Sequence, residues 1–297
     1  MKQYVLNLDT KFNPFPPGNF NTPYELQFDS FTFGGGEPHI QIDKPEYIDP
    51  FDLVTITHRY NMPGDLIQII LANDALKRLG FNNIELVLPY FPGARQDRVC
   101  NEGEALSVKV FSDMINSCKF NRVFIYSPHS DVTPALIDNV VELDLDKVFL
   151  KEIINELERP RGVNIVCPDA GAGKRVGKLT KEMADAFPGI NFNLIRCEKI
   201  RDVATGELKE FFVMNDDLRG FPTIIVDDIV ANGGTFLGLG KVLNERNCGK
   251  LILFTSHADH TEGLGKMGEF FDQVYTSNSK SNGVPYANNV TKIKITL

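Results

Sequence analysis

The sequence lacks an excess of basic residues and lacks any long hydrophobic run. Its 297 residues include 31 Lys and Arg against 39 Asp and Glu, a formal net charge of -8. Nucleic acids attract proteins through basic surfaces, so this balance disfavours nucleic acid as a partner. No apolar run approaches the length of a membrane span, and the first ten residues lack the apolar core of a signal peptide. These absences predict a cytoplasmic protein that binds neither nucleic acid nor membrane.

The cysteines follow no structural pattern either. Their number is odd and no two of them form a C-x-x-C pair, which disfavours a disulfide framework and a zinc site. A reducing compartment fits this usage better. The five residues are Cys100, Cys118, Cys167, Cys197 and Cys248.

The length and the order of the apolar patterns predict an α/β protein with two domains. A chain of this length exceeds what one hydrophobic core comfortably serves. Strand and helix patterns alternate in both halves, which favours a mostly parallel sheet flanked by helices in each. We place the junction near Asp144, which gives domains 1–144 and 145–297. The expected strands are 52–57, 84–88, 122–126, 163–166, 192–195, 211–213, 224–226 and 251–255, and the expected helices are 63–79, 104–116, 147–157, 174–187 and 235–243.

The stretch from Thr223 to Thr235, TIIVDDIVANGGT, combines a buried strand, two carboxylates and a glycine-bearing loop before a helix. Backbone N–H groups at a helix N-terminus suit a phosphate group. The two carboxylates, Asp227 and Asp228, suit hydroxyl groups or a metal ion. A sugar phosphate would satisfy both parts of the stretch.

Polar groups also follow two strands of the first half, where open α/β sheets bind ligands. Arg95, Gln96, Asp97 and Arg98 come after the strand 84–88, and His129 comes after the strand 122–126. Two arginines suit a polyphosphate but also suit simple exposure to solvent. A lone histidine is more often a structural residue than a ligand or a base.

Two segments of the second half could carry chemistry. The segment CPDAGAGKR, residues 167–175, looks like a Walker loop, but Arg175 replaces the required Ser or Thr and Pro168 replaces the first glycine. What remains is Asp169 after a buried strand, a position suited to a metal ion or a phosphate. Residues 196–208 alternate cations and anions, which is typical of a solvated hairpin. As a mobile flap, this segment could also bring Lys199 and Arg201 over a phosphate chain.

Together these segments resemble the ribose-phosphate diphosphokinase family, also called phosphoribosyl pyrophosphate synthetases, over most of the chain. The motifs occur in the family order and at the family spacing. They are Phe33 and Glu37 of the adenine loop, Arg95 to Arg98 of the nucleotide motif, His129, Asp169, Lys199 and Arg201 of the catalytic flexible loop, and Val226 to Thr235 of the sugar-phosphate loop.

The resemblance implies an enzyme that transfers the β,γ-diphosphoryl group of Mg-ATP to the C1 hydroxyl of ribose 5-phosphate. The products would be phosphoribosyl pyrophosphate and AMP. It implies two type I phosphoribosyltransferase-like domains. Residues 1–144 would carry the ATP-binding motifs, and residues 145–297 the ribose 5-phosphate loop and the catalytic flexible loop.

The resemblance also implies a role for each motif. Lys199, Arg201 and His129 would be catalytic, and His129 and Asp169 would hold Mg²⁺. A homo-oligomer, at least a dimer, follows because the adenine loop of the family reaches a neighbouring subunit. The implied ATP-binding residues are Phe33, Glu37, Arg95, Gln96, Asp97 and Arg98, and the implied ribose 5-phosphate-binding residues are Asp227, Asp228, Ala231, Asn232, Gly233, Gly234 and Thr235.

The sequence departs from the family pattern at several of these motifs. Ala231 and Asn232 replace Asp and Thr in the sugar-phosphate loop, which removes one carboxylate near the ribose. Gly35 replaces the Asp of the adenine loop. Ser127 replaces the Asp two residues before the histidine, and Ala172 replaces a glycine after Asp169.

Two other functions remain open at this point. A phosphoribosyltransferase uses the same sugar-phosphate loop but needs no ATP site, so Arg95 to Arg98 and the first domain argue against it. A catalytically silent subunit that regulates a synthetase is the second alternative. Lys199, Arg201 and His129 count against that alternative, and Ala231 counts for it.

Overall fold

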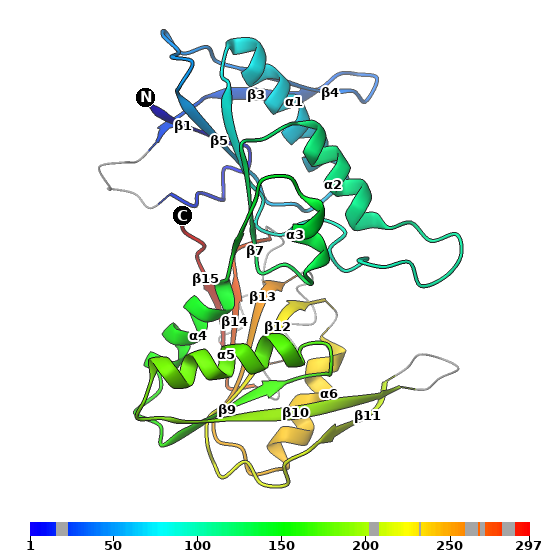
Figure 1. Cartoon of the computed structure of the whole chain (residues 1–297), viewed down its shortest axis with the longest axis vertical. Helices are drawn as coiled ribbons and strands as arrows, with labels where there is room; N and C mark the ends of the chain where they lie inside the picture. Colours follow the sequence, from blue (N-terminus) through cyan, green and yellow to red (C-terminus); the bar gives the residue numbers. More distant parts are fainter. Residues whose placement is uncertain (16–22, 202–207, 232, 259–266, 268–270, 281–288) are drawn as a thin grey trace. The chain divides into compact units, whose positions relative to one another are not determined.

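The chain folds into two compact units. The computed structural model describes all residues except 16–22, 202–207, 232, 259–266, 268–270 and 281–288, and describes only the backbone of residues 199–201 and 208–210 (Figure 1). Unit 1 contains Met1–Leu143, Asn278–Ser281 and Lys294–Leu297. Unit 2 contains Asp144–Ser277 and Asn282–Ile293. Two late segments of the chain therefore belong to unit 1, whereas the sequence placed everything after residue 144 in the second domain.

Unit 1 is built on a six-stranded parallel sheet with the strand order β2-β1-β5-β6-β7-β8. Its strands are β1 (Gln3–Asn7), β2 (Tyr24–Glu25), β5 (Leu53–Thr57), β6 (Asn83–Val87), β7 (Arg122–Tyr126) and β8 (Val140–Leu143). Its helices are α1 (Pro63–Leu79), α2 (Ser107–Ser117) and α3 (Val132–Leu136).

The three helices in the described part of unit 1 cover the same face of the sheet (Figure 1). β5, β6, β7 and β8 follow β1 across the sheet in chain order, each on the same side of the previous strand, whereas β2 lies on the other side of β1. Because crossovers between parallel strands are right-handed, an unreversed order places every connecting helix on one face. Alternate residues of the strands, such as Val54, Ile56 and Leu86, face these helices and are fully buried there.

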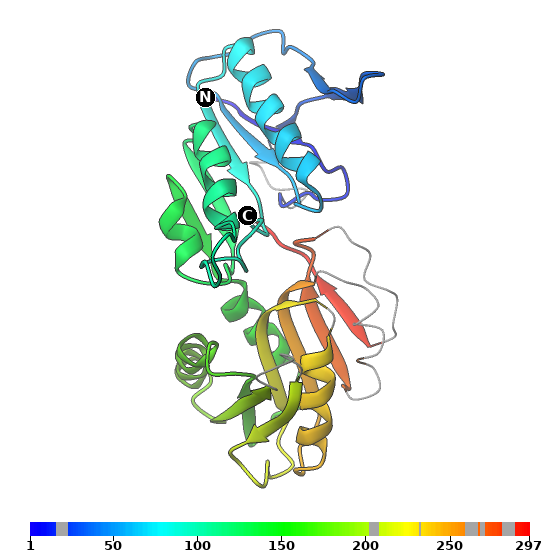
Figure 2. The same cartoon turned by 90° about the vertical axis from the view of Figure 1, so that its right-hand side faces the viewer.

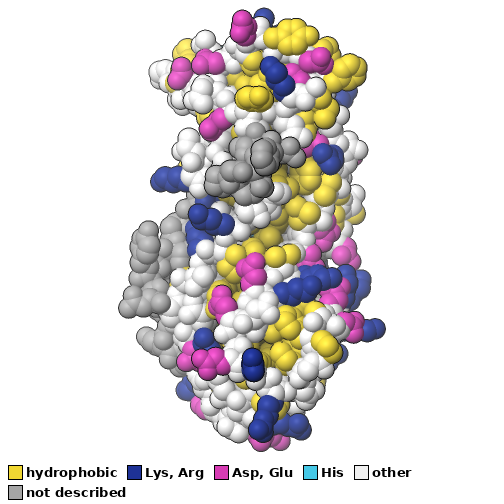
Figure 3. Space-filling view, turned by 90° about the vertical axis from the view of Figure 1, so that its left-hand side faces the viewer, with side chains coloured by type: hydrophobic (Ala, Val, Ile, Leu, Met, Phe, Trp, Pro, Cys, Tyr) yellow, Lys and Arg dark blue, Asp and Glu magenta, His cyan; other side chains and the backbone are white. Residues whose placement is uncertain are grey.

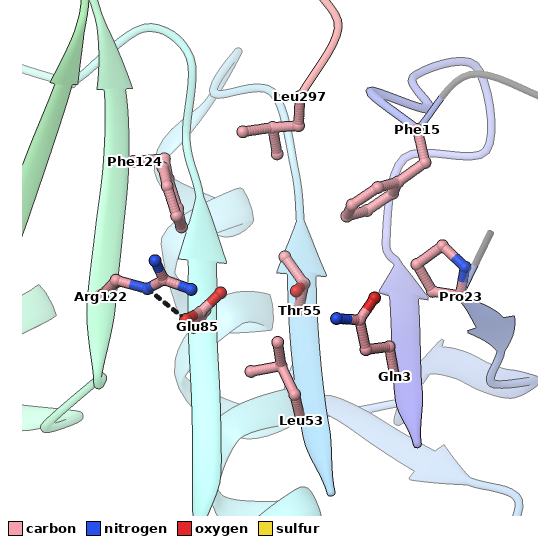
Figure 4. A pocket seen from close by; sticks show the side chains of 9 residues that line it. All are labelled: Gln3, Phe15, Pro23, Leu53, Thr55, Glu85, Arg122, Phe124 and Leu297. Atoms are coloured by element: carbon pink, nitrogen blue, oxygen red, sulfur yellow. Dashed lines mark hydrogen bonds and ion pairs between the residues drawn. The ribbon is translucent and has the colours of Figure 1, made fainter. Parts of the chain in front are cut away.

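The opposite face of this sheet carries polar side chains, including Thr55, Glu85 and Arg122 (Figure 4). Glu85 is buried and forms an ion pair with Arg122 on the next strand. A pocket of about 190 Å³ lies on this face, with Phe15 and Leu297 at its border. The backbone N–H of Leu297 donates to the carbonyl of Pro14 at 2.8 Å. Two chain segments far apart in sequence thus partly cover a face on which none of the described helices of unit 1 lies.

A separate antiparallel hairpin, β3 (Phe28–Thr32) and β4 (Pro38–Ile42), packs beside α1. Gln68 of α1 donates to the hydroxyl of Ser30 at 3.2 Å. The glycine turn between Phe33 and Glu37 joins the two strands, as its composition predicts. The first turn of α1 is capped by Asp65, whose carboxylate accepts from the N–H groups of Asn61 and Met62.

Unit 2 is built on a seven-stranded sheet with the order β11-β10-β9-β12-β13-β14-β15. Only β11 pairs antiparallel. The strands are β9 (Gly162–Cys167), β10 (Asn191–Arg201), β11 (Leu208–Val213), β12 (Thr223–Val230), β13 (Leu251–Ala258), β14 (Gln273–Ser277) and β15 (Val290–Ile293). The helices are α4 (Leu145–Asn155), α5 (Gly173–Ala186) and α6 (Gly234–Asn244).

The strand order of unit 2 reverses between β9 and β12. The chain passes from β9 to β10 on one side, and later from β12 to β13 on the other. With right-handed crossovers, α5 and α6 must then lie on opposite faces of the sheet, and Figure 2 shows them there. The carboxyl ends of β9 and β12 form a topological switch point, the place where open α/β sheets bind ligands.

Most expected helices and strands are present, and two of their boundaries differ for clear reasons. The helix expected from residue 104 begins at Ser107, because Glu104 instead closes the preceding turn by accepting from the N–H groups of Cys100 and Asn101. The strand expected to end at Val226 continues to Val230. Asp227 and Asp228 therefore lie within β12 and do not follow it.

The surface mixes charges of both signs. On the face drawn in Figure 3, Lys and Arg side chains are interspersed with Asp and Glu, and hydrophobic side chains show between them. No helix in the described part of the chain is both long and apolar enough to cross a membrane.

Candidate functional site

The first candidate site lies in unit 1, in the loop that follows β6. Arg98 donates from Nε to Asp97 Oδ1 at 3.0 Å. The side chain of Asp97 is only 6% exposed, whereas that of Arg98 is 74% exposed. The hydrogen bond from Arg98 lowers the pKa of Asp97, with further lowering from the Ser130 hydroxyl and from the charge of His129. Asp97 is thus a buried anchor that holds an exposed guanidinium at the end of the sheet.

His129 and Ser130 come from the loop after β7. Because β6 and β7 are adjacent parallel strands, the loops at their carboxyl ends meet at the same edge of the sheet. The structure therefore brings together Asp97 and His129, which the sequence analysis had placed at the ends of two strands. Arg95, Gln96 and His129 are exposed there.

A glycine sets the path of the first loop. Gly93 has a φ of 70°, and a Cβ atom on it would lie 2.7 Å from the Phe111 ring and 3.0 Å from the backbone of Ser107. Ser107 and Phe111 belong to α2, so the loop runs directly against the start of that helix. Gln96 N–H then donates to the Gly93 carbonyl at 2.8 Å, which fixes the turn before Asp97.

Phe33 and Glu37 lie at the exposed turn of the β3–β4 hairpin. Phe33 N–H donates to the Glu37 carbonyl at 2.9 Å, and Gly36, at a φ of 89°, donates to the Phe33 carbonyl at 2.8 Å. The Phe33 ring centroid is 5.0 Å from that of Phe31 and 5.7 Å from that of His39. The hairpin thus presents an exposed aromatic surface beside a carboxylate.

The second candidate site lies at the switch point of unit 2. Asp169 follows β9, and its Oδ1 accepts from the N–H of Ala172 at 3.1 Å. Burial raises the pKa of the Cys167 thiol, and the charges of Asp169 and Asp227 add to this effect. Both carboxylates therefore lie near the end of β9, where β12 runs alongside.

One arginine connects three carboxylates at this switch point. Arg175, in the first turn of α5, donates from Nη1 to Asp146 Oδ2 at 2.5 Å. Its Nη2 lies 3.2 Å from Asp227 Oδ1 and 3.9 Å from Asp228 Oδ1. Burial and the neighbouring carboxylate of Asp228 raise the pKa of Asp227 to about 8, although Arg175 opposes this shift.

The sugar-phosphate loop leads from β12 into α6. Gly233 is the N-cap of α6, at a φ of 76°, and its carbonyl accepts from the N–H groups of Phe236 and Leu237 at 3.0 Å. Gly234 and Thr235 begin the first turn of the helix, so their backbone N–H groups belong to its N-terminus. Ala231 is half-buried, and Asn232 lies outside the described residues.

The predicted catalytic flap lies at the far end of β10. The backbone of Lys199 pairs with Phe211 of β11, and Arg201 is the last residue of β10. The side chains of Lys199 and Arg201 lie outside the described residues. Their catalytic roles stay predictions.

The proposed metal ligands come from different units, with His129 in unit 1 and Asp169 in unit 2. Among the residues that the structure describes, no group of three or more His, Cys, Asp or Glu side chains could hold a metal ion. The protein thus offers no complete metal cage in its described part.

Sequence reasoning missed two residues of the second site, Arg175 and Asp146. The sequence marked Arg175 only as a mismatch to a Walker loop, and no motif marked Asp146. The available signal was the position of Arg175 in the first turn of a helix that follows a buried strand.

Both halves of the chain match known protein families. A match to the N-terminal domain of ribose phosphate pyrophosphokinase covers residues 28–118, and a match to the phosphoribosyl transferase domain covers residues 147–286. The chain belongs to the ribose-phosphate pyrophosphokinase family. The recognition made from the sequence motifs is thereby confirmed.

Individual members of the ribose-phosphate pyrophosphokinase family match most of the chain. The ribose-phosphate pyrophosphokinase of Sulfurisphaera tokodaii is 28% identical over 236 residues, which are 78% of this chain and 77% of the relative. That of Mycoplasma genitalium is 28% identical over 255 residues, which are 83% of this chain and 73% of the relative.

A solved structure matches the fold of nearly the whole chain. It is the crystal structure of phosphoribosylpyrophosphate synthetase from Mycobacterium smegmatis, with a TM-score of 0.77 and 19% sequence identity. The match covers 99% of this chain and 95% of the other. The predicted fold class, α/β with mostly parallel sheets flanked by helices, is confirmed.

Proposed function

We propose that this protein is a ribose-phosphate diphosphokinase. It transfers the β,γ-diphosphoryl group of ATP to the C1 hydroxyl of ribose 5-phosphate, giving phosphoribosyl pyrophosphate and AMP. The observation that carries the proposal is the second candidate site, where two carboxylates and a glycine-led helix N-terminus occur on one β-strand and its loop. Membership of the ribose-phosphate pyrophosphokinase family supports it.

Ribose 5-phosphate binds in unit 2. The backbone N–H groups from Gly233 to Thr235 hold the 5-phosphate, because a helix N-terminus attracts anions and supplies donors without internal partners. Asp227 and Asp228 accept hydrogen bonds from the ribose hydroxyls. Ala231 and Asn232 complete the loop, and the smaller Ala231 leaves the backbone contacts to the phosphate in place.

ATP binds through the residues of unit 1. Arg95, Gln96 and Arg98 contact the phosphates, and Asp97 keeps Arg98 in position through their 3.0 Å hydrogen bond. Phe33 and Glu37 contact the adenine of a neighbouring subunit by stacking and hydrogen bonding. The chain therefore acts as a homo-oligomer, at least a dimer.

Catalysis rests on position and on neutralising charge, as is usual for in-line transfer between phosphate groups. Lys199 and Arg201 close over the β- and γ-phosphates and offset the negative charge that collects around the migrating phosphorus. His129, which is exposed at the end of β7, contacts the same phosphate chain. We place the reaction in the cytoplasm.

The residues present suit Mg²⁺ that arrives with ATP. Such an ion takes most of its ligands from phosphate oxygens and water and needs only one or two from the protein. Asp169 offers a carboxylate and His129 an imidazole, which is a donor set of this small kind. When bound, the ion supplies positive charge that screens the phosphates.

The test is to mix the purified protein with ribose 5-phosphate and Mg-ATP and to follow the products by chromatography. We expect AMP and phosphoribosyl pyrophosphate in equal amounts, and no AMP when ribose 5-phosphate is omitted. The absence of both products would sink the proposal in favour of a silent regulatory subunit. Consumption of added phosphoribosyl pyrophosphate with a free base, releasing diphosphate, would indicate a phosphoribosyltransferase.

A further inference from the structure

At the switch point of unit 2, one arginine contacts three acidic side chains. Each of Asp146, Asp227 and Asp228 has an oxygen within 4.0 Å of an Arg175 nitrogen. Two of the three, Asp227 and Asp228, are the residues proposed to accept hydrogen bonds from the ribose hydroxyls. Arg175 therefore joins the proposed sugar-binding residues to a third carboxylate that has no proposed contact with the sugar.

Asp146 differs from the other two carboxylates because it is fixed on both sides. Its side chain is 4% exposed and lies in the first turn of α4. One oxygen accepts from Arg175, and the other accepts from the hydroxyl of Ser256 on β13. Asp146 is therefore a rigid support that holds one end of the Arg175 guanidinium.

We propose that Arg175 is a positioning residue that orients the Asp227 carboxylate toward the ribose hydroxyls, and that Asp146 sets the orientation of Arg175. This inference rests on the proposed function, because it assigns a specificity role within the ribose 5-phosphate site. Neither residue needs to touch the sugar. Both act through Asp227.

The geometry requires an arginine. One planar guanidinium directs Nη1 to Asp146 on α4 and Nη2 to Asp227 on β12, so it ties two elements together through two different nitrogen atoms. A lysine ammonium is a single point of charge on a flexible stem and cannot hold both carboxylates in fixed directions. Arg175→Lys therefore retains the charge and loses the orientation.

A fixed carboxylate allows the site to discriminate between sugars by their hydroxyl groups. A site built to accept a hydrogen bond from a substrate hydroxyl binds the analogue without that hydroxyl poorly, because a buried polar group is left unpaired. If the Asp227 side chain can turn away from the sugar, the loss of affinity for a sugar without that hydroxyl becomes smaller. The ratio of activities with ribose 5-phosphate and 2-deoxyribose 5-phosphate then reports the role of Arg175.

The first test compares Arg175→Lys and Arg175→Gln with the wild type. We expect KM for ribose 5-phosphate to rise about tenfold or more, which is the usual effect of losing a hydrogen bond to a charged group. KM for ATP should stay within about twofold. The preference for ribose 5-phosphate over 2-deoxyribose 5-phosphate should fall in both variants, and thermal unfolding shows whether each variant is folded.

The second test uses Asp146→Asn, which keeps the shape of the support and removes its charge. We expect the same pattern as for Arg175→Lys, with a higher KM for ribose 5-phosphate and a weaker preference for the 2-hydroxyl group. Lys178→Gln is the matched control, because Lys178 lies on the same helix with its side chain 75% exposed. This variant should leave the KM for ribose 5-phosphate, the KM for ATP and the preference for ribose 5-phosphate over 2-deoxyribose 5-phosphate unchanged.

Titration calorimetry with ribose 5-phosphate alone separates this inference from the proposed function. Wild-type protein that binds ribose 5-phosphate but forms no product overturns the proposed function, and weaker binding by Arg175→Lys then still supports the positioning role. The inference alone is overturned if the wild-type protein forms product and the Arg175 and Asp146 variants keep full discrimination between the two sugars. Equal rises in KM for both substrates overturn it as well, because they indicate a general structural defect.

Discussion

The carboxyl group of Asp227 lies where its charge is unfavourable. Burial and the carboxylate of Asp228 raise its pKa from its ordinary value of 3.8 to about 8. Between these two pH values, the Asp227 carboxyl group keeps its proton in the folded chain but has released it in the unfolded chain. The contribution of Asp227 to the free energy of unfolding therefore falls as the pH rises from about 4 to about 8.

The first prediction is that Asp227→Asn removes this pH dependence. The variant should gain in Tm over the wild type as the pH is raised from 5 to 8, by at least about 2 °C. Asp217→Asn is the control, because the N–H of Arg219 lowers the pKa of Asp217 and its contribution changes only at lower pH. A constant difference in Tm between pH 5 and pH 8 would show that Asp227 is ionised in the folded chain.

The second prediction concerns the proposed flap. Lys199→Ala should lower kcat by about tenfold or more, since a cation that offsets charge in the transition state is lost. Steady-state rates of AMP formation measure this effect. Lys181→Ala, at an exposed position of α5, serves as the control. An unchanged kcat for Lys199→Ala would remove Lys199 from the catalytic residues.

Single functional residues could be predicted from the sequence only where a motif marked them. Asp97 and His129 could be found because each follows a predicted strand, and adjacent strands bring such residues together. The Arg175 partners are 29 and 52 positions away in the chain, and no local pattern indicates which distant carboxylate an arginine will meet. That pairing depends on how α4, α5 and β12 pack.

Among the elements, the loop between β6 and α2 depends most directly on one glycine. The third prediction is that Gly93→Ala destabilises the protein by about 2 kcal/mol or more, because a positive φ and a close contact with Phe111 both oppose a side chain. Gly103→Ala is the matched control, with a φ of 87° and nothing within 4 Å of the added atom. Urea unfolding of both variants isolates the cost of the contact.

An equal loss of stability in the two glycine variants would contradict the prediction. It would mean that backbone strain alone accounts for the effect and that α2 moves aside. We also expect Gly93→Ala to raise KM for ATP, because the turn that it fixes leads directly to Arg95 and Arg98.

Elements could be predicted from the sequence where the apolar pattern is strong, as in α1 and β5. The sequence reading failed for the end of β12, because two adjacent carboxylates disfavour a strand and suggest a loop. The structure continues the strand because Ile229 and Val230 are buried and pair with β13, and because Arg175 offsets part of the charge. This contribution from distant residues outweighs the local preference.

At the scale of the whole molecule, the last residues of the chain complete unit 1. Ile295 is 1% exposed, and its N–H donates to the side chain of Asn278 at 2.8 Å. The fourth prediction is that Ile295→Ala destabilises unit 1 by about 2–4 kcal/mol, the usual cost of such a core truncation. Thermal unfolding measures it, with the exposed Thr296→Ala as the control. Equal Tm values for the two variants would contradict a structural role for this segment.

The sequence could indicate two α/β halves but not the return of the chain to unit 1. The segment KIKITL after residue 291 is short, and its apolar residues alternate as in any edge strand. Residues 292 and 293 end β15 of unit 2, and residues 294–297 continue into unit 1 without forming a strand. Where such a segment packs depends on which face of a sheet is left uncovered. In unit 1 the helices that the structure describes all lie on the other side of the sheet, which leaves this face to other segments. Composition does not reveal this property of the strand order.

The return of the chain affects how the protein must be made. A ribosome releases the chain from its N-terminus, and domains commonly fold as they emerge. Unit 1 is first in the chain, yet Ile295 and Leu297, which belong to it, are synthesised after the segments of unit 2. Unit 2 can therefore acquire nearly all of its strands before unit 1 has its final contacts. We expect the nascent first half to stay partly open, and accessible to chaperones, until residues 294–297 have emerged.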